Sequence, residues 1–264
     1  MAEESTKVRT RRPITQLPFV PRQPKLCALW ARLSLGVVLG SLAIFFSAAQ
    51  ASAVIGGSAT TIEQAPWQAE VEVSGVGPGE SEVERCGGTI IANDEVLTAA
   101  HCLYDWYTGQ AVRAAQVKVL AGTSNYDSLG DEAQERAVSG THVHPYFSYE
   151  EDALPWHDDV AVLDLSAPLA LGATVKVIEL VPSGALLDEG APVAFTGFGE
   201  DVFRSTPTGQ MYSVDMTLRF PRECVGAANA LFLCTGEAAG SPCLGDIGSG
   251  LTVPGSSSEP RCDR

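Results

Sequence analysis

The chain has 264 residues, of which 45% are hydrophobic, and it carries a formal net charge of −15. This excludes a disordered tail and allows one large domain or two small ones with real cores. The first 53 residues hold seven basic and two acidic residues, which leaves ten basic and thirty acidic residues, a net charge of −20, in the remainder. Such a body repels nucleic acid and anionic membrane surfaces, and favours either cationic partners or simply the solubility of an exported protein.

Residues 1–53 are typical of an export signal. Basic residues continue up to Arg32, an uncharged apolar stretch runs over residues 33–49, and Ala-Ser-Ala at 51–53 is a pattern that signal peptidase cuts. The apolar stretch is slightly shorter than the ~20 residues of a membrane span, so an uncleaved membrane anchor is the alternative. We expect a secreted, extracellular protein that begins at Val54, with membrane attachment only through an uncleaved signal.

The cysteine pattern also fits export. Cys27 lies in the predicted signal, and an even number remains in the mature chain, which indicates disulfide bonds. These residues are Cys86, Cys102, Cys224, Cys234, Cys243 and Cys262. Fifteen pairings are possible, and the spacing alone does not choose among them. There is no Cys-x-x-Cys and no histidine cluster at metal-ligand spacing, so we expect no metal site and no cofactor.

After Val54, short alternating segments are separated by Gly, Pro, Asn and Asp. Alternation of apolar and polar residues predicts strands at residues 67–73, 117–121, 160–163, 192–195 and 212–217. Residues 124–139 are acidic and unpatterned, and residues 256–264 carry no strand or helix signal. Many short strands without a long helical period favour antiparallel barrels or sandwiches.

Four separated motifs carry the candidate chemistry. In chain order they are Val-Ile-Gly-Gly at 54–57, Leu-Thr-Ala-Ala-His-Cys at 97–102, His-Asp-Asp-Val-Ala-Val-Leu at 157–163 and Cys-Leu-Gly-Asp-Ile-Gly-Ser-Gly at 243–250. Lesser marks are Cys-Gly-Gly-Thr-Ile-Ile at 86–91, His-Pro at 144–145 and Gly-Phe-Gly at 197–199. Each motif is weak alone, but their order and spacing are specific. The sequence resembles the chymotrypsin/trypsin family of serine peptidases over residues 54 to about 251.

The resemblance implies an all-β fold, the chymotrypsin-like double antiparallel β-barrel, in a secreted member of bacterial type. On that basis residues 1–53 are the signal, and residues 54–170 form the first β-barrel, which carries His101 and Asp159. Residues 171–255 form a partial second β-barrel, and residues 256–264 are a tail unlike the family.

The family's chemistry assigns roles to these residues. Peptide hydrolysis there uses a serine hydroxyl activated by a histidine base, and a buried carboxylate orients that histidine. By resemblance His101 is the base and Asp159 the carboxylate, because the family's aspartate directly precedes an apolar strand. Asp158 is the less favoured choice. The plain alternative for His101 is an ordinary histidine beside a disulfide.

The same resemblance assigns the surroundings of the reaction. Backbone N–H groups of Gly245 and Ile247 would form the oxyanion hole. Asp246 would pair with the new α-amino group of Val54 once the signal is removed; the alternative is a surface turn aspartate. Ser241 would lie at the base of the specificity pocket, where a neutral residue argues against a preference for Lys or Arg.

Family pairing further implies the disulfides Cys86–Cys102 and Cys224–Cys234. The family partner of Cys243 lies downstream, in a segment without a counterpart in this sequence. Cys262 is a substitute partner, although its surroundings match nothing in the family.

Two departures from the family decide the predicted function. Ile247 occupies the nucleophile position and has no hydroxyl, so no acyl-enzyme can form there. Ser249 lies two residues further on, past the sharp turn, where its placement disfavours attack. Relatives also continue for about fifty residues past the nucleophile, whereas this chain has seventeen more. A pocket wall and barrel strands would therefore be missing.

Three hypotheses follow from these departures. The chain is a non-catalytic protease homologue that binds a protein or peptide, an active endopeptidase whose sequence carries an error or frameshift, or a decayed gene product. The first keeps the family ligand, a protein or peptide segment, and leaves the oligomeric state open. Asp127, Asp131, Glu132 and Glu135 form an acidic loop that is a weak candidate for Ca²⁺, because solvated acidic loops are commoner.

Overall fold

The computed structural model describes residues 54–149, 157–185, 187–199, 209–219, 233–236, 240–243, 245–254 and 260–262. The predicted export signal at 1–53 and Cys224 lie outside these ranges. Within them, no helix is both long enough and apolar enough to cross a membrane.

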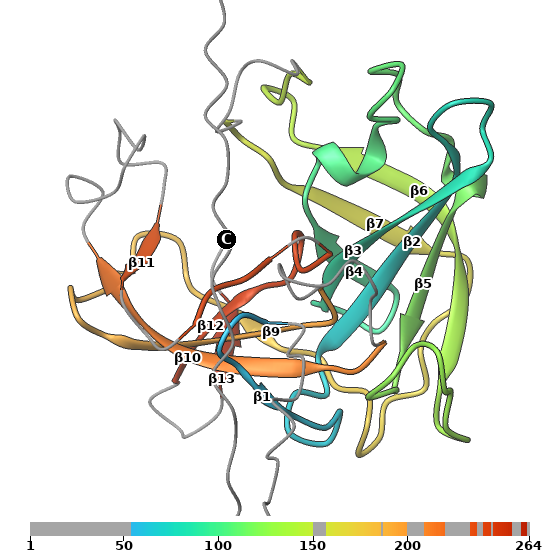
Figure 1. The fold of residues 1–264 in the computed structure, drawn as a ribbon. Helices are drawn as coiled ribbons and strands as arrows, with labels where there is room; N and C mark the ends of the chain where they lie inside the picture. The colour runs from blue at the N-terminus through green and yellow to red at the C-terminus, as the bar shows by residue number, and fades with distance from the viewer. Residues whose placement is uncertain are drawn as a thin grey trace, which may run out of the picture. The chain divides into compact units, whose positions relative to one another are not determined.

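Six strands form a closed antiparallel barrel, seen in Figure 1 with β2–β7 labelled. They are β2 (Gln68–Val76), β3 (Glu82–Ile90), β4 (Glu95–Thr98), β5 (Val117–Ala121), β6 (Gln134–Val143) and β7 (Ala161–Leu165), in the order β2-β3-β4-β7-β6-β5. Alternating apolar side chains such as Val71, Val73, Val117 and Val119 point inward, and all four are fully buried. The predicted strands at 67–73, 117–121 and 160–163 are present within this barrel.

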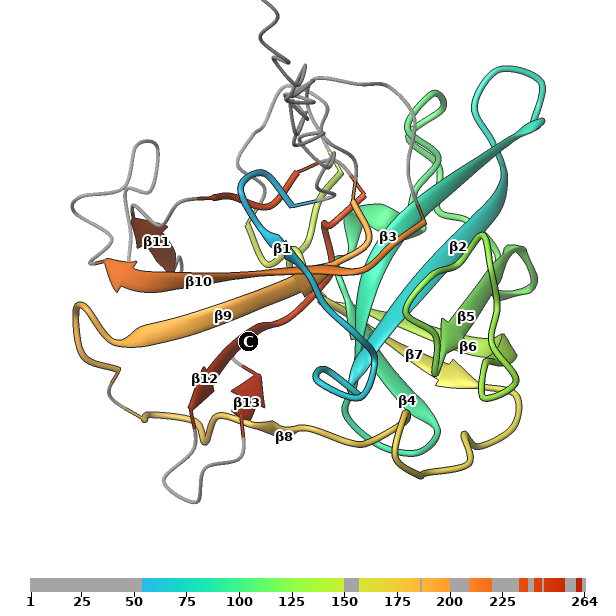
Figure 2. The same ribbon diagram turned by 60° about the horizontal axis from the view of Figure 1, so that its bottom comes forward.

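The remaining strands form a second sheet that does not close (Figure 2). They are β1 (Ser58–Ala59), β8 (Glu179–Leu180), β9 (Pro192–Gly197), β10 (Tyr212–Arg219), β11 (Cys234–Gly236), β12 (Leu251–Pro254) and β13 (Pro260–Cys262). Their order is β1-β10-β9-β12-β13-β8, and β11 pairs with β10. Two short 3-10 helices, η1 (His101–Leu103) and η2 (Ala114–Gln116), interrupt the strands. The predicted all-β class, with one barrel complete and the second incomplete, is confirmed.

Two segments without a strand signal nevertheless form strands. β6 begins at Gln134, inside the acidic stretch at 124–139, and pairs with both β5 and β7. Its outer face is charged, as where Glu135 lies 3.6 Å from Lys118, so few apolar residues mark the period of two. β13 lies in the tail at 256–264, antiparallel to β12 and parallel to β8. The sequence of β13 has no strand pattern, and the strand is stabilised by pairing with its neighbours on both sides.

Candidate active site

Neighbouring strands of the closed barrel bring His101 and Asp159 together. η1 begins with His101 directly after β4, and Asp159 precedes β7, which pairs with β4 through Thr98 and Ala161. Asp159 Oδ2 lies 2.7 Å from His101 Nδ1, and Asp159 Oδ1 accepts the His101 backbone N–H at 2.8 Å. The two bonds fix both the ring and the backbone of the histidine. The imidazole is largely shielded from water, with 10% of the His101 side chain exposed.

Asp158 faces a different histidine. Its Oδ1 lies 3.7 Å from His144 Nδ1, and its φ of 56° lies in the left-handed region. That backbone turn places adjacent carboxylates in different surroundings. The structure therefore brings Asp159, rather than Asp158, to His101.

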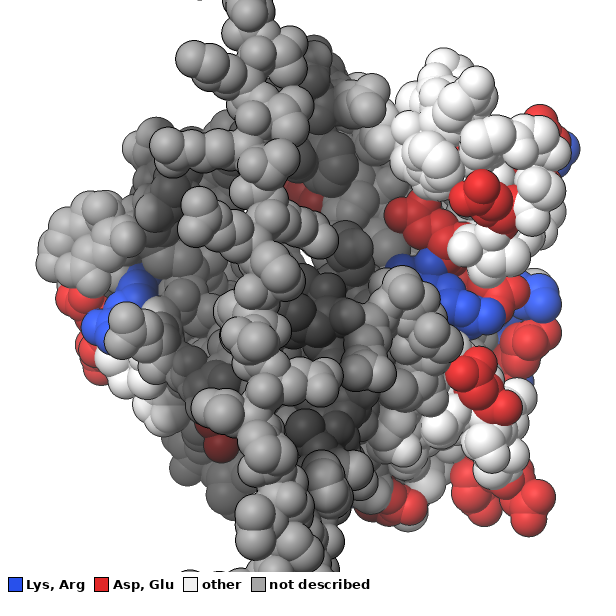
Figure 3. All heavy atoms as spheres, in the orientation of Figure 1, with Lys and Arg blue, Asp and Glu red and all other residues white. Residues whose placement is uncertain are grey.

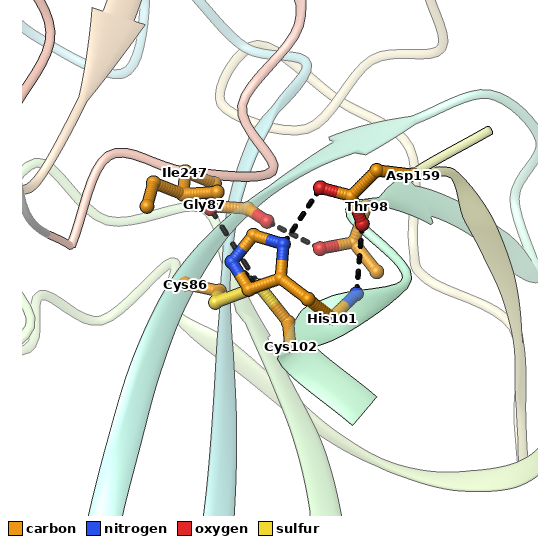
Figure 4. A network of polar contacts seen from close by, with 7 residues as sticks. All are labelled: Cys86, Gly87, Thr98, His101, Cys102, Asp159 and Ile247. Carbon is orange, nitrogen blue, oxygen red and sulfur yellow. Dashed lines mark hydrogen bonds and ion pairs between the residues drawn. A yellow bond between two sulfur atoms is a disulfide. The ribbon is translucent and has the colours of Figure 1, made fainter. Parts of the chain in front are cut away.

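A disulfide joins Cys86 of β3 to Cys102 of η1, which confirms the predicted pair. Cys102 Sγ lies 3.9 Å from His101 Nε2 and 4.0 Å from the carbonyl oxygen of Ile247. Figure 4 shows Ile247 on the side of the imidazole away from Asp159. The disulfide thus lies between His101 and the turn at 245–250.

Hydrogen bonds hold that turn against the closed barrel. The Gly87 N–H of β3 donates to the Ile247 carbonyl at 2.7 Å, and the Gly250 N–H donates to Thr89 Oγ1 at 2.9 Å. Gly248 has a φ of 94°, and a Cβ there would clash with the Gly87 carbonyl. The turn is therefore built from glycine where it bends and where it touches β3. Ile247 is 42% exposed.

Ser249 faces the barrel wall. Its Oγ accepts a hydrogen bond from Gln68 Nε2 at 2.8 Å, and a Cβ on Gly87 would clash with that oxygen. Gln68 is 1% exposed, and its Oε1 accepts a hydrogen bond from Thr196 Oγ1 of β9 at 2.7 Å. Gln68 thus bonds both to the second sheet and to the turn. Sequence reasoning missed it, because one glutamine in an alternating strand matches no motif.

Asp246 is fully buried, which rules out the alternative of a surface turn aspartate. Its Oδ1 accepts the Gly199 N–H at 2.8 Å and its Oδ2 accepts the Cys243 N–H at 2.9 Å. Loss of water around the carboxylate raises the pKa of Asp246 to about 6, although both hydrogen bonds favour the charged form. A Cβ on Gly197 would clash with Asp246 Oδ1, so the carboxylate fits only beside glycine.

The predicted N-terminal residue is buried in the second sheet. Val54 is fully buried in a cluster that includes Phe195 and Val214. The next residue, Ile55, forms a backbone bridge with Ser241, through N–H···O distances of 3.0 and 2.9 Å. Ser241 itself is exposed, and its Oγ donates to the Pro242 carbonyl. The salt bridge between a free Val54 amine and Asp246 remains a prediction.

A second carboxylate lies within electrostatic range of His101. Burial raises the pKa of Glu84, on β3, and the charge of His101 acts in the opposite direction. Glu84 Oε2 is buried and has no hydrogen-bond partner among the described residues. Nothing in the sequence around Glu84 signals this position, because its proximity to His101 arises from strand pairing.

Two further predictions concern cysteines and metals. Cys234 is disulfide-bonded, but its predicted partner Cys224 lies outside the described residues, so that pair stays a prediction. Cys243 is a free thiol.

Among the residues that the structure describes, no three His, Cys, Asp or Glu side chains are grouped to hold a metal ion. In the acidic loop, Asn125 Oδ1 accepts the N–H groups of Asp127 and Ser128, which is ordinary turn chemistry.

Comparison with known proteins decides the family. The family model described as Trypsin matches residues 54–257. The chain belongs to the trypsin family. It is 31% identical to Hypodermin-B of Hypoderma lineatum over 209 residues, which cover 76% of this chain and 73% of that protein. It is 29% identical to trypsin beta of Drosophila erecta and 27% identical to trypsin delta of Drosophila melanogaster, over 76% of this chain and 74% of each relative.

These relatives are insect proteins, so they give no support to the expected bacterial type. The family match over residues 54–257 covers the closed barrel and the open sheet except β13.

Proposed function

We propose that this trypsin-family chain is a secreted protein that accepts a peptide or protein segment beside His101 without hydrolysing it. The observation that carries the proposal is the side chain at 247. The Ile247 carbonyl is bonded to Gly87 and lies 4.0 Å from Cys102 Sγ, next to the histidine, and isoleucine offers no hydroxyl for the histidine to activate. In a comparable protease, loss of the nucleophilic serine costs about 10⁶ in turnover.

Ser249 is a poor substitute nucleophile. Its Oγ is bonded to the buried Gln68 amide and packed against Gly87. Attack would require breaking that hydrogen bond and turning the Ser249 side chain away from Gly87 of β3, within a turn that is packed against β3 at Gly248. The chain therefore keeps the base and its carboxylate but lacks an attacking group.

The remaining family features complete the proposal. Gly245 and Ile247 supply the oxyanion N–H donors, and Asp246 receives the Val54 ammonium after the signal is cut. Ser241 lies at the base of the specificity pocket. Burial of Asp246 supports its part, because an ammonium beside it would offset the desolvation that holds its pKa near 6.

Labelling with a serine-reactive phosphonate tests inactivity directly. The secreted chain should remain unlabelled and should not hydrolyse peptide esters. Labelling that Ser249→Ala abolishes would mean that Ser249 attacks, and would overturn the proposal in favour of an active endopeptidase.

Restoring a hydroxyl separates the two departures from the family. We expect Ile247→Ser alone to stay inactive, because the second sheet is not closed into a barrel. Ile247→Ser joined to a family-like C-terminal segment of about thirty-five residues should gain activity, since that length closes the barrel edge. Activity from Ile247→Ser alone would show that the open sheet suffices. Inactivity of the joined chain would contradict the assigned roles of His101, Asp159 or the Val54–Asp246 pair.

A further inference from the structure

A cavity of about 230 Å³ lies beside Gly245, outside the His101–Asp159 pair. Its walls come from β2, β3, the loop after β5, the segment after β9 and the turn before β12. The lining residues are Glu70, Val83, Arg85, Tyr126, Phe198, Gly199 and Gly245. Water occupies about 30 Å³ per molecule in the liquid, so the cavity has room for an amino-acid side chain.

Glu70 is the unusual member of this wall. Its side chain is 2% exposed, and its Oε1 accepts a hydrogen bond from Arg85 Nη1. Its Oε2 is buried and has no hydrogen-bond partner among the described residues. Burial raises the pKa of Glu70 to about 7, even though Arg85 acts in the opposite direction. The guanidinium therefore compensates this carboxylate only in part.

The charges around the cavity are negative in sum. Arg85 also serves Glu72, whose Oε2 lies 3.0 Å from Arg85 Nη2, and it stacks 4.6 Å above the Tyr126 ring. One guanidinium is thus shared by two carboxylates, and the charge of Asp127 also reaches Glu70. Figure 3 shows a small group of basic side chains over the closed barrel with acidic side chains around it. Lys118 belongs to the outer part of this network, 4.0 Å from Glu72 and 3.6 Å from Glu135.

We propose that this cavity is a subsite for a cationic side chain of the bound peptide, an ammonium on an apolar stem. The positive charge of an ammonium in the cavity would offset the carboxylate of Glu70, whose buried Oε2 has no hydrogen-bond partner among the described residues. The apolar stem matches the rings of Tyr126 and Phe198, whose centroids lie 5.9 Å apart. An anionic side chain would be repelled by Glu70 and Glu72. A neutral side chain would leave the excess negative charge around the cavity uncompensated.

The subsite rests on the proposed function, because Gly245 places it next to the assigned oxyanion donors. The cavity would select peptides that carry a basic residue at one position, in keeping with the acidic composition of the protein. Ser241, the residue assigned to the specificity pocket, takes no part in this selection.

Amide NMR of the secreted chain with a matched set of small probes tests the subsite. Nα-acetyl-lysine methylamide should shift the Gly199 and Gly245 amide signals saturably. It should bind about fivefold more tightly than the norleucine analogue, which has the same stem without the charge. The Nε-acetylated lysine probe should behave like norleucine, and the glutamate analogue should not shift these signals. Equal binding of lysine and norleucine, or no shift of either amide, would overturn the proposal.

A variant pair identifies the carboxylate responsible. Glu70→Gln should remove the preference for lysine, whereas Glu80→Gln, in the exposed turn before β3, should leave it unchanged. A preference that survives in a folded Glu70→Gln chain would contradict the role of Glu70. If Glu70→Gln does not fold, the neutral Nε-acetylated probe still decides the charge requirement on the unmodified chain.

The probes also separate this inference from the proposed function, because they need only the cavity. Lysine selectivity together with phosphonate labelling would leave the subsite standing and the proposed inactivity refuted. No lysine selectivity together with no phosphonate labelling would refute the subsite and leave the proposed inactivity standing.

Discussion

Asp246 is the residue whose surroundings we expect to change if the signal is removed at Val54. In the uncut chain it is a buried carboxyl held by two backbone N–H groups, with a pKa raised to about 6 by loss of water. An acid whose pKa is higher in the folded than in the unfolded state holds its proton more firmly in the fold. The folded state therefore gains from protonation and loses that gain as pH rises.

The uncut chain should accordingly become less stable as the pH rises from 3.8, the ordinary pKa of Asp246, to about 6. The loss is on the order of 3 kcal/mol, at 1.36 kcal/mol per pKa unit. In the processed chain the Val54 ammonium would favour the charged carboxylate, so the decline should shrink or reverse. Urea unfolding of both forms across this pH range checks the prediction.

Asp246→Asn in the uncut chain is the control, because the amide does not titrate and its share of the pH dependence should vanish. Identical pH profiles for cut and uncut protein would show that the new amine does not reach Asp246.

At this scale, short motifs located some side chains and missed others. His101, Asp159 and Asp246 sit in recognisable strings, so resemblance pointed to them before their contacts were known. Gln68 and Glu70 lie in an alternating strand with no string around them. Their partners are up to 181 residues away in the chain, so only strand pairing reveals them.

Among the elements, η1 depends on a single covalent link. The Cys86–Cys102 disulfide ties it to β3 across a separation of sixteen residues. A loop of this length contributes about 3 kcal/mol by limiting the unfolded chain. Replacing both cysteines with alanine should lower the free energy of unfolding by about that amount, as measured by urea titration.

Cys243→Ser is the matched control, since Cys243 is a free thiol, and its unfolding midpoint should stay near that of the parent. A double alanine variant as stable as the parent would mean that packing around η1, with Leu103 buried, suffices without the bond.

β13 provides a second test at the level of elements. The strand is paired on both sides, with β12 and with β8, so the N–H of Arg261 lies in a ladder whichever way it points. Arg261→Pro removes that donor and should lower the free energy of unfolding by about 1–3 kcal/mol. Thermal unfolding followed by circular dichroism measures the change.

Arg261→Thr keeps the N–H and favours extended backbone, so it should melt close to the parent. If the proline and threonine variants melt together, β13 contributes nothing measurable to the sheet.

Sequence patterns predicted the strands that pack apolar residues inward, such as β5 and β9, because burial imposes a period of two. They did not predict β3, β4, β6 or β13. β6 carries charges on its outer face, and β13 is defined by the strands on either side of it. The incomplete second barrel was implied by the family resemblance and not by any strand pattern.

For the whole molecule, the prediction with the widest consequences is the release of Val54 by signal cleavage. The pattern Ala51-Ser52-Ala53 predicts the cut, and burial of Val54 in the second sheet gives the new terminus a place in the core. Terminal sequencing of protein from culture medium should read Val-Ile-Gly-Gly. An intact Met1 or a cut elsewhere would contradict both the export signal and the proposed pairing with Asp246.

The glycine contacts between barrel and turn also limit how this molecule can be recombined. Gly87 of the first barrel has no room for a Cβ beside Ser249 of the turn, and Gly248 of the turn has none beside the Gly87 carbonyl. Gln68 must find both a hydroxyl at 249 and one at 196. A chimera that takes its first half from one relative and its second half from another will therefore assemble only if these contacts are inherited as a set. The residues in contact between the two halves must therefore be exchanged together.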